Sequence, residues 1–103
     1  MTSNEYLINN TLALKGILSE LDACGLSVIG MTFGNHPENH LEIHCHSTDA
    51  CHKWMRIKGA EIEEFHEIYP YQAIIQYPNQ ISVFCLLTEE EKQEMEEIIN
   101  DAQ

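Results

Sequence analysis

YQAIIQYPNQISVFCLL, residues 71–87, decides the fold that this sequence predicts. The polar residues PNQ separate two runs, residues 71–77 and residues 81–87, and a short turn between two apolar runs is typical of a β-hairpin. The second run is apolar on both faces, whereas a strand at the surface alternates apolar and polar residues. We therefore expect residues 81–87 to form a central or doubly covered strand, with the other elements arranged around it.

An earlier stretch predicts another hairpin. Residues 27–34 (SVIGMTFG) alternate, residues 35–39 (NHPEN) have turn chemistry, and residues 41–45 (LEIHC) alternate again. Successive side chains of a strand point to opposite faces. Leu41 and Cys45 are therefore expected in the core, and the histidines of this strand on the opposite face.

Helical periodicity covers residues 3–23, where leucines recur at helical intervals. Thr2 and Glu5 have the spacing of a capping box at the start of this segment, and Gly25 is a typical stop signal after it. We expect a single amphipathic helix here.

Two further helices are expected. Residues 50–58 follow a run of capping residues and are closed by Gly59. Residues 89–101 follow a second capping box, made by Thr88 and Glu91.

Residues 60–69 fit either a strand or a helix, and we take them as a third strand that ends at Pro70. The expected order is then α-β-β-α-β-β-β-α in a single α+β domain, residues 1–103. Because hairpins pair antiparallel, we expect an antiparallel sheet of four to five strands with helices packed on one face.

The charge balance excludes some classes of function. Seventeen acidic residues against five basic ones give a net charge of −12, which repels nucleic acid, so direct DNA or RNA binding is not expected. No apolar run approaches the ~20 residues of a membrane helix, and the N-terminus lacks a basic, apolar leader. We therefore expect a cytoplasmic protein that does not bind membranes.

The four cysteines are too widely spaced for a disulfide framework, and we expect reduced thiols. Cys24 and Cys85 are predicted to be core residues. Cys51 is expected near a helix N-terminus, which would favour its thiolate, and His52 is next to it. A buried apolar role for Cys51 is favoured over a nucleophilic one, because no orienting third group is evident.

Histidines are concentrated in residues 40–52, where they suggest an alternative function as a metal-binding protein or a hydrolase that uses this histidine-rich strand. His44 and His46 lie on one face of a strand and can share one ion, with His52 as the nearest third ligand. His36 or His66 could replace it. The favoured interpretation is that these histidines coat an exposed strand and that the protein has no cofactor; the alternative cofactor is zinc.

Acidic residues are concentrated in residues 60–69 and 89–101, which together hold eleven of the seventeen acids. On the last helix, four acids recur every three or four residues and so share one side. The candidate contact residues for a partner are Glu90, Glu94, Glu97, Asp101, Glu61, Glu63, Glu64 and Glu67.

A row of carboxylates on a rigid element can imitate a phosphate backbone. Small proteins of phages and mobile elements, among them anti-CRISPR and anti-restriction proteins, use this device to inhibit nucleic-acid-binding defence proteins; the analogy rests on charge and on no family motif. We therefore expect a non-enzymatic protein that binds a basic, nucleic-acid-binding protein, with Tyr69, Tyr71 and Tyr77 as aromatic anchors. The alternatives are an acidic helix that is simply solvated and a homodimer built through a strand edge.

Overall fold

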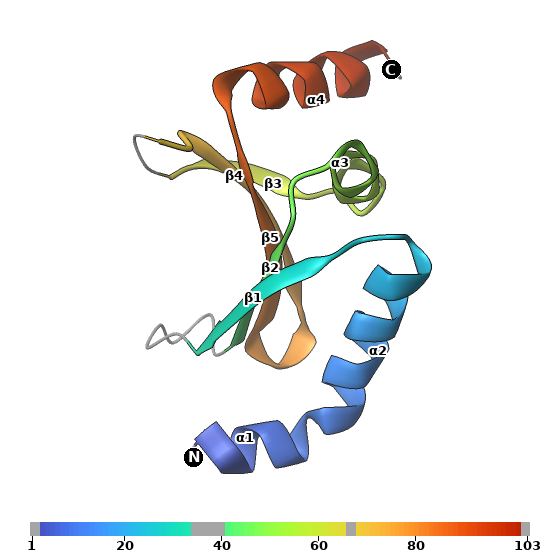
Figure 1. The fold of residues 1–103 in the computed structure, drawn as a ribbon, viewed down its shortest axis with the longest axis vertical. Helices are drawn as coiled ribbons and strands as arrows, with labels where there is room; N and C mark the ends of the chain where they lie inside the picture. Colours follow the sequence, from blue (N-terminus) through green and yellow to red (C-terminus); the bar gives the residue numbers. More distant parts are fainter. Residues whose placement is uncertain (1–2, 34–40, 66–67, 102–103) are drawn as a thin grey trace.

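The computed structural model describes residues 3–33, 41–65 and 68–101, without the side chains of Ser3, Leu7 and residues 97–101. Its elements, in chain order, are α1 (Ser3–Asn9), α2 (Thr11–Ala23), β1 (Val28–Phe33), β2 (Leu41–Cys45), α3 (Asp49–Ile57), β3 (Glu61–Glu64), β4 (Tyr71–Tyr77), the 3₁₀ turn η1 (Pro78–Gln80), β5 (Ile81–Leu87) and α4 (Glu89–Asp101) (Figure 1).

The strands form one mixed sheet in the order β1-β2-β5-β4-β3. Neighbouring strands are antiparallel except β2 and β5, which pair in parallel from Leu41 opposite Ile81 to His44 opposite Phe84. The α+β class is confirmed, and the prediction of a fully antiparallel sheet is wrong. The apolar strand β5 lies at the centre as expected, because β4 covers one of its edges and β2 the other.

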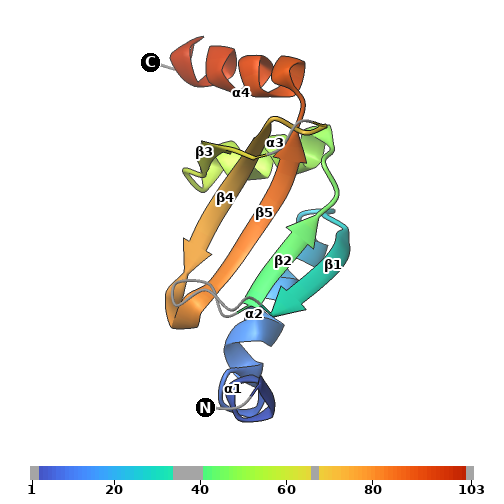
Figure 2. The same ribbon diagram turned by 90° about the vertical axis from the view of Figure 1, so that its left-hand side faces the viewer.

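Helices α2 and α3 cover one face of the sheet, and the opposite face is turned to the viewer in Figure 2. α4 lies beyond the end of β5, and α1 lies at the other end of the molecule. The expectation of helices on one face therefore holds for α2 and α3. α4 instead extends the core at one end, where the side chain of Met95 is buried.

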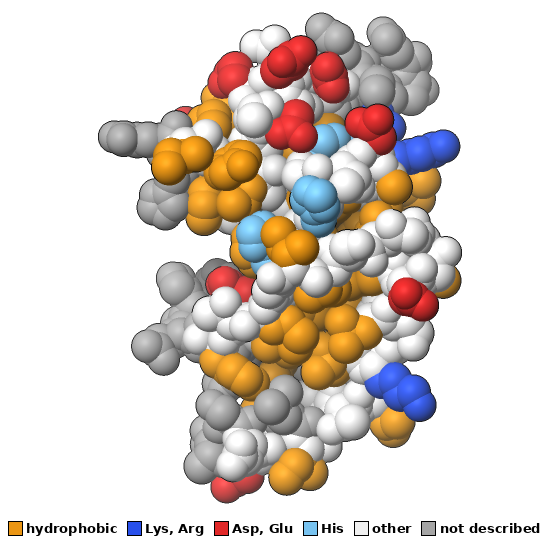
Figure 3. All heavy atoms as spheres, in the orientation of Figure 1, with side chains coloured by type: hydrophobic (Ala, Val, Ile, Leu, Met, Phe, Trp, Pro, Cys, Tyr) orange, Lys and Arg blue, Asp and Glu red, His pale blue; other side chains and the backbone are white. Residues whose placement is uncertain are grey.

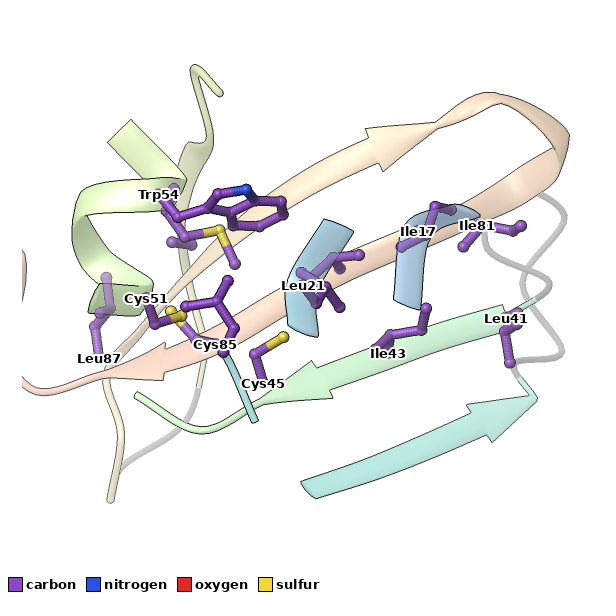
Figure 4. Packing of buried hydrophobic residues seen from close by; sticks show 14 of the residues in the cluster. Ile17, Leu21, Leu41, Ile43, Cys45, Cys51, Trp54, Ile81, Cys85 and Leu87 are labelled. Atoms are coloured by element: carbon purple, nitrogen blue, oxygen red, sulfur yellow. The ribbon is translucent and has the colours of Figure 1, made fainter. Parts of the chain in front are cut away.

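The core lies between β2, β5 and the two covering helices (Figure 4). Leu41, Ile43 and Cys45 alternate with half-buried residues along β2, which confirms the predicted phase of this strand. Cys85 is buried as predicted, but Cys24 is exposed, so that prediction is wrong. Cys24 is the C-cap of α2 and lies past the last buried turn of that helix.

The helix predicted over residues 3–23 is broken at Asn10 into α1 and α2. The Asn10 side chain donates a hydrogen bond of 2.9 Å to the Tyr6 carbonyl, and the Thr11 hydroxyl donates one of 3.3 Å to the Ile8 carbonyl. Side chains of this kind compete with the helical ladder for backbone groups. The break turns α1 toward β1, where the Tyr6 ring meets the Phe33 ring edge-on at 6.4 Å.

The residues that were expected to begin or end helices in the described part of the chain do so. Gly25 and Gly59 both have a φ of +75°, the left-handed conformation that terminates a helix. The capping box of α4 is formed, because Thr88 and Glu91 each bond the backbone N–H of the other through their side chains. The capping box expected at Thr2 and the turn expected at residues 35–39 lie outside the described residues.

Candidate functional site

The two acidic segments lie at the same end of the molecule. β3 pairs with the first residues of β4, and that part of β4 pairs with the last residues of β5, from which the chain enters α4. The Lys92 ammonium of α4 lies 4.5 Å from the centre of the Tyr71 ring at the start of β4. Figure 3 shows acidic side chains gathered over α4. The residues 60–69 that were ambiguous in the sequence are thus strand over Glu61–Glu64, next to α4.

Most of these carboxylates have no cation beside them within the described residues. Glu61, Glu64 and Glu90 are exposed and make no ion pair there. Glu63 accepts a hydrogen bond from the Gln72 amide. The single lysine of α4, Lys92, is 3.5 Å from Glu96, one turn further along the helix. Among the described residues, the exposed acidic charge at this end is therefore largely uncompensated by nearby bases.

Glu94 differs from the other candidate residues because it faces basic side chains. It lines a pocket of about 210 Å³ between α3 and α4 together with Lys53 and Arg56 of α3. No ion pair within 4.0 Å joins Glu94 to either base among the described residues. The Arg56 Nη1 atom is buried and has no hydrogen-bond partner in the described part of the chain. The charge of Glu94 is thus partly offset at longer range.

α4 is fixed to the fold by a polar cluster that the sequence did not reveal. His52 of α3 is buried, and its Nε2 atom lies 2.6 Å from Ser47 Oγ and 3.3 Å from Glu91 Oε2. The Ser47 hydroxyl donates a hydrogen bond to the same carboxylate at 3.1 Å. The capping-box spacing predicted that Glu91 caps α4. Its contacts with Ser47 and His52 depend on the tertiary fold, which brings α3 and the loop before it close to Glu91.

The ionisation of Glu91 reflects this environment. Burial acts to raise the pKa of Glu91, but hydrogen bonds from the backbone and hydroxyl of Thr88, the hydroxyl of Ser47 and the charge of His52 together lower it. Glu91 is therefore ionised at neutral pH and is part of the fold, whereas Glu89 and Glu90 beside it are exposed.

The predicted metal ligands lie in different environments. The His44 ring, on the sheet face opposite α2 and α3, stacks on the Phe84 ring with centres 4.6 Å apart, and burial followed by the charge of His46 lowers the pKa of His44. His46 is exposed just after β2, and His52 is held by its bonds to Ser47 and Glu91. Among the described residues, no group of three or more His, Cys, Asp or Glu side chains is placed to hold a metal ion. The set of His44, His46 and His52 stays a prediction.

Cys51 is fully buried, as the apolar interpretation predicted, and packs with Cys45 and Cys85 in the core (Figure 4). The pKa of the Cys51 thiol is lowered, first by a hydrogen bond with Cys85 and then, against the effect of burial, by the backbone of Thr48. Burial raises the pKa of Cys45 to about 12. With no exposed surface, these thiols cannot meet a substrate in the folded protein.

Several of the remaining candidate residues lie outside the part of the chain that the structure describes. Glu67, His36 and His66 lie outside the described residues; Glu97 and Asp101 lie within α4, but their side chains are not described. Of the proposed aromatic anchors, Tyr69 is exposed, whereas the Tyr77 hydroxyl donates a hydrogen bond to Glu20 inside the molecule. Tyr69 is thus the anchor best placed for a partner.

Comparison of the chain with protein-family models, with curated protein sequences and with solved structures gives no match. No helix among the described residues is long and apolar enough to cross a membrane.

Proposed function

We propose that this protein is a non-enzymatic interaction protein whose acidic end, made by β3 and α4, binds a basic surface of another protein. The observation that carries the proposal is the group of exposed glutamates without a cation partner among the described residues, chiefly Glu61, Glu64 and Glu90. Their elements lie side by side, because β3 and the start of α4 meet at the same end of β4 and β5.

The mechanism is competition with nucleic acid for cationic sites. The four acids Glu90, Glu94, Glu97 and Asp101 span eleven helical steps from first to last, or ~16 Å at 1.5 Å per residue. This is about one charge per 5 Å of helix, against one per ~3.4 Å along a DNA strand. α4 therefore carries negative charge at a somewhat lower linear density than a DNA strand, and the glutamates of β3 add to that charge.

Rigidity favours this use of the charge. The capping box of Thr88 and Glu91 and the contact of Glu91 with His52 hold the first turn of α4, so little conformational entropy is lost when its glutamates meet a partner. Charge alone gives long-range attraction and fast association rather than tight binding. Tyr69, exposed between β3 and β4, supplies apolar contact area beside the charges.

The test is affinity capture with the intact protein as bait, followed by binding measurements on the purified partner. The proposal predicts a basic partner whose affinity falls at least tenfold between ~0.05 and ~0.3 M salt, because exposed charges are screened over that range. It also predicts that a DNA or RNA ligand of that partner competes with the bait. Equal binding at both salt concentrations, or simultaneous binding of bait and nucleic acid, would contradict the proposal.

Charge reversal locates the surface. Glu61→Lys, Glu64→Lys and Glu90→Lys are each expected to weaken binding several-fold, and the triple variant to abolish it. Asp22→Lys is the matched control, since Asp22 is exposed on α2 and the substitution changes the net charge by the same amount. If Asp22→Lys weakens binding as much as Glu90→Lys, the effect is one of net charge and the acidic end is not the contact surface.

A further inference from the structure

β1 is an edge strand that exposes apolar side chains. β1 ends the strand order and has β2 as its only paired strand in the described sheet. Ile29, Met31 and Phe33 are 57%, 45% and 41% exposed, and Val28 is 36% exposed. None of the six residues VIGMTF carries a charge, although the chain as a whole has a net charge of −12.

The register explains this exposure. Met31 lies opposite Ile43 and Phe33 opposite Leu41, so both belong to the face of the sheet that the helices cover in β2. An irregularity between Val28 and Gly30 shifts the pairing at the start of the strand. α2 buries Leu41 and Ile43 but leaves their β1 neighbours half-exposed. Figure 3 looks onto this edge and shows hydrophobic side chains gathered over β1 and toward α2.

The backbone edge of β1 and its exposed apolar side chains both favour an uncharged strand as the partner. An edge strand presents a row of free N–H and C=O groups, which another strand can pair with directly. A charged partner strand would place its charges against apolar side chains, whereas a strand like β1 itself would not. Identical strands pair antiparallel around a two-fold axis, which closes the assembly at two copies.

We propose that β1 pairs antiparallel with β1 of a second copy of this chain, which joins the two sheets into one of ten strands. Six residues give an edge of ~20 Å, and because directly opposite residues share a face of the sheet, a two-fold axis at Met31 places Met31 opposite Met31 of the second copy. This inference goes beyond the proposed function and does not depend on it.

The size of the contact sets the strength of the dimer. Four large side chains that are about half exposed present roughly 350 Å² of apolar surface, in addition to the backbone edge. A standard interface buries about 800 Å² on each partner, so the β1 contact is at the small end of specific interfaces. We expect a dissociation constant in the micromolar range.

Electrostatic repulsion does not oppose this dimer strongly. The acidic strand β3 is at the opposite edge of the sheet from β1. In a ten-stranded sheet the two copies of β3 are about 43 Å apart at ~4.8 Å per strand. That separation is several times the ~8 Å screening length at physiological ionic strength. The acidic ends of the two copies therefore point outward, away from the contact.

Sedimentation equilibrium of the full chain tests the proposal, with protein from ~1 µM to ~1 mM in ~0.15 M salt. A reductant is needed because Cys24 is exposed and could form an unrelated disulfide. The expected result is a reversible transition from the 11.8 kDa monomer to a species of twice that mass. A monomer at every concentration would overturn the proposal, as would growth into species larger than a dimer.

A single charge on β1 locates the interface. Thr32→Lys places an ammonium in the middle of the exposed edge and is expected to raise the dissociation constant at least tenfold. Ser19→Lys, at an exposed position of α2, makes the same change in charge and is expected to leave the dimer intact. A dimer that withstands Thr32→Lys, or one that Ser19→Lys weakens equally, would overturn the proposal.

Hydrogen exchange provides a readout in the unmodified protein, which matters if Thr32→Lys fails to fold. The amide hydrogens of β1 that point away from β2 are expected to exchange more slowly at ~1 mM than at ~1 µM protein, while those of β3 exchange at one rate. Exchange in β1 that is independent of concentration would overturn the proposal whatever the variants do.

Discussion

The two edges of the sheet, β1 and β3, are built in opposite ways. β1 is six residues long, uncharged and apolar, whereas β3 has four residues of which three are glutamates. Both strands are largely exposed, and within the described sheet each pairs with one neighbour. Short length and charge are two ways in which proteins prevent an edge strand from pairing with another chain. β3 has both protections and β1 has neither.

The difference places acidic residues on one edge of the sheet and none on the other. A uniform spread of seventeen acids would place some of them on each edge, but β1 has none. The sheet thus has one charged edge strand and one uncharged, apolar edge strand.

The largest effect is expected when the protection of β3 is removed. Replacing Glu61, Glu63 and Glu64 together by threonine keeps a good strand former at each position and removes three charges. With both edges open, sheets can add to each other without limit, and we expect large assemblies detectable by light scattering at neutral pH. Lysine at the same three positions keeps the edge charged and is expected to remain as small as the wild type. A threonine variant of unchanged size would show that β3 is protected by something other than charge.

The next largest effect concerns the boundary between β1 and the core. Ile43→Ala, at a fully buried position of β2, is expected to cost about 2–5 kcal/mol of folding free energy. Met31→Ala, at the paired position on β1, is expected to cost less than about 1 kcal/mol, because Met31 is half exposed. Denaturant unfolding at ~1 µM protein measures both values in the monomer. Similar losses of folding free energy in the two variants would mean that the Met31 side chain is covered and that β1 is not an exposed edge strand.

A smaller effect is expected where the acidic end is attached to the rest of the fold. Glu91→Gln removes the charge that holds His52 and weakens the capping box of α4, and we expect a loss of about 1–2 kcal/mol in unfolding experiments at pH 7. Glu90→Gln, one residue earlier and exposed, is the control and is expected to change stability by less than about 0.5 kcal/mol. Equal losses of unfolding free energy in the two variants would contradict the role of Glu91 in attaching α4 to the fold.

The pH dependence of the same variant follows from the lowered pKa of Glu91. Because the folded pKa of Glu91 is below the unfolded value of about 4.3, its contribution is fully present above that value and is lost as the pH falls through the folded pKa. The difference in melting temperature between wild type and Glu91→Gln is therefore expected to shrink between about pH 6 and pH 3. A difference that stays constant over this range would contradict the assignment.

The smallest effect is expected at the ion pair between α2 and the end of α3. Lys58 Nζ after α3 is 2.8 Å from Glu20 Oε1 of α2, and this exposed pair is expected to contribute about 0.2–1 kcal/mol. Lys58→Met keeps the apolar stem and removes the charge. The loss of unfolding free energy in Lys58→Met is expected to disappear at ~1 M salt, where such ion pairs are screened. A cost that persists at high salt would indicate packing rather than charge.

Much of the fold was predictable because local signals set it. The apolar run of β5 predicted its central position, the alternation of β2 predicted its buried side, and Gly25, Gly59 and the Thr88–Glu91 capping box predicted where helices end or begin. The parallel pairing of β2 with β5 was not predictable in this way. It depends on the path of the chain through α3, β3 and β4, which no short pattern records.

The candidate site was predictable only in part, for a similar reason. The sequence placed Glu90 on a helix, and it placed Glu61 and Glu64 in a third strand whose assignment was ambiguous. Their proximity comes from the pairing of β3 with β4 and of β4 with β5. The contact of His52 with Glu91 joins residues far apart in the chain, so helix periodicity could not reveal it. The break at Asn10 depends on side-chain bonds that compete closely with helix formation.

The parallel seam between β2 and β5 also divides the molecule into two contiguous lengths of chain. α1 to α3 and the strands β1 and β2 come before Gly59, whereas β3, β4, β5 and α4 come after it. Gly59 is exposed and in a turn, and a backbone cut there interrupts no strand or helix. The protein is therefore suited to be produced as two separate fragments that recombine through the β2–β5 ladder, which would turn its folding into a bimolecular reaction that dilution can reverse.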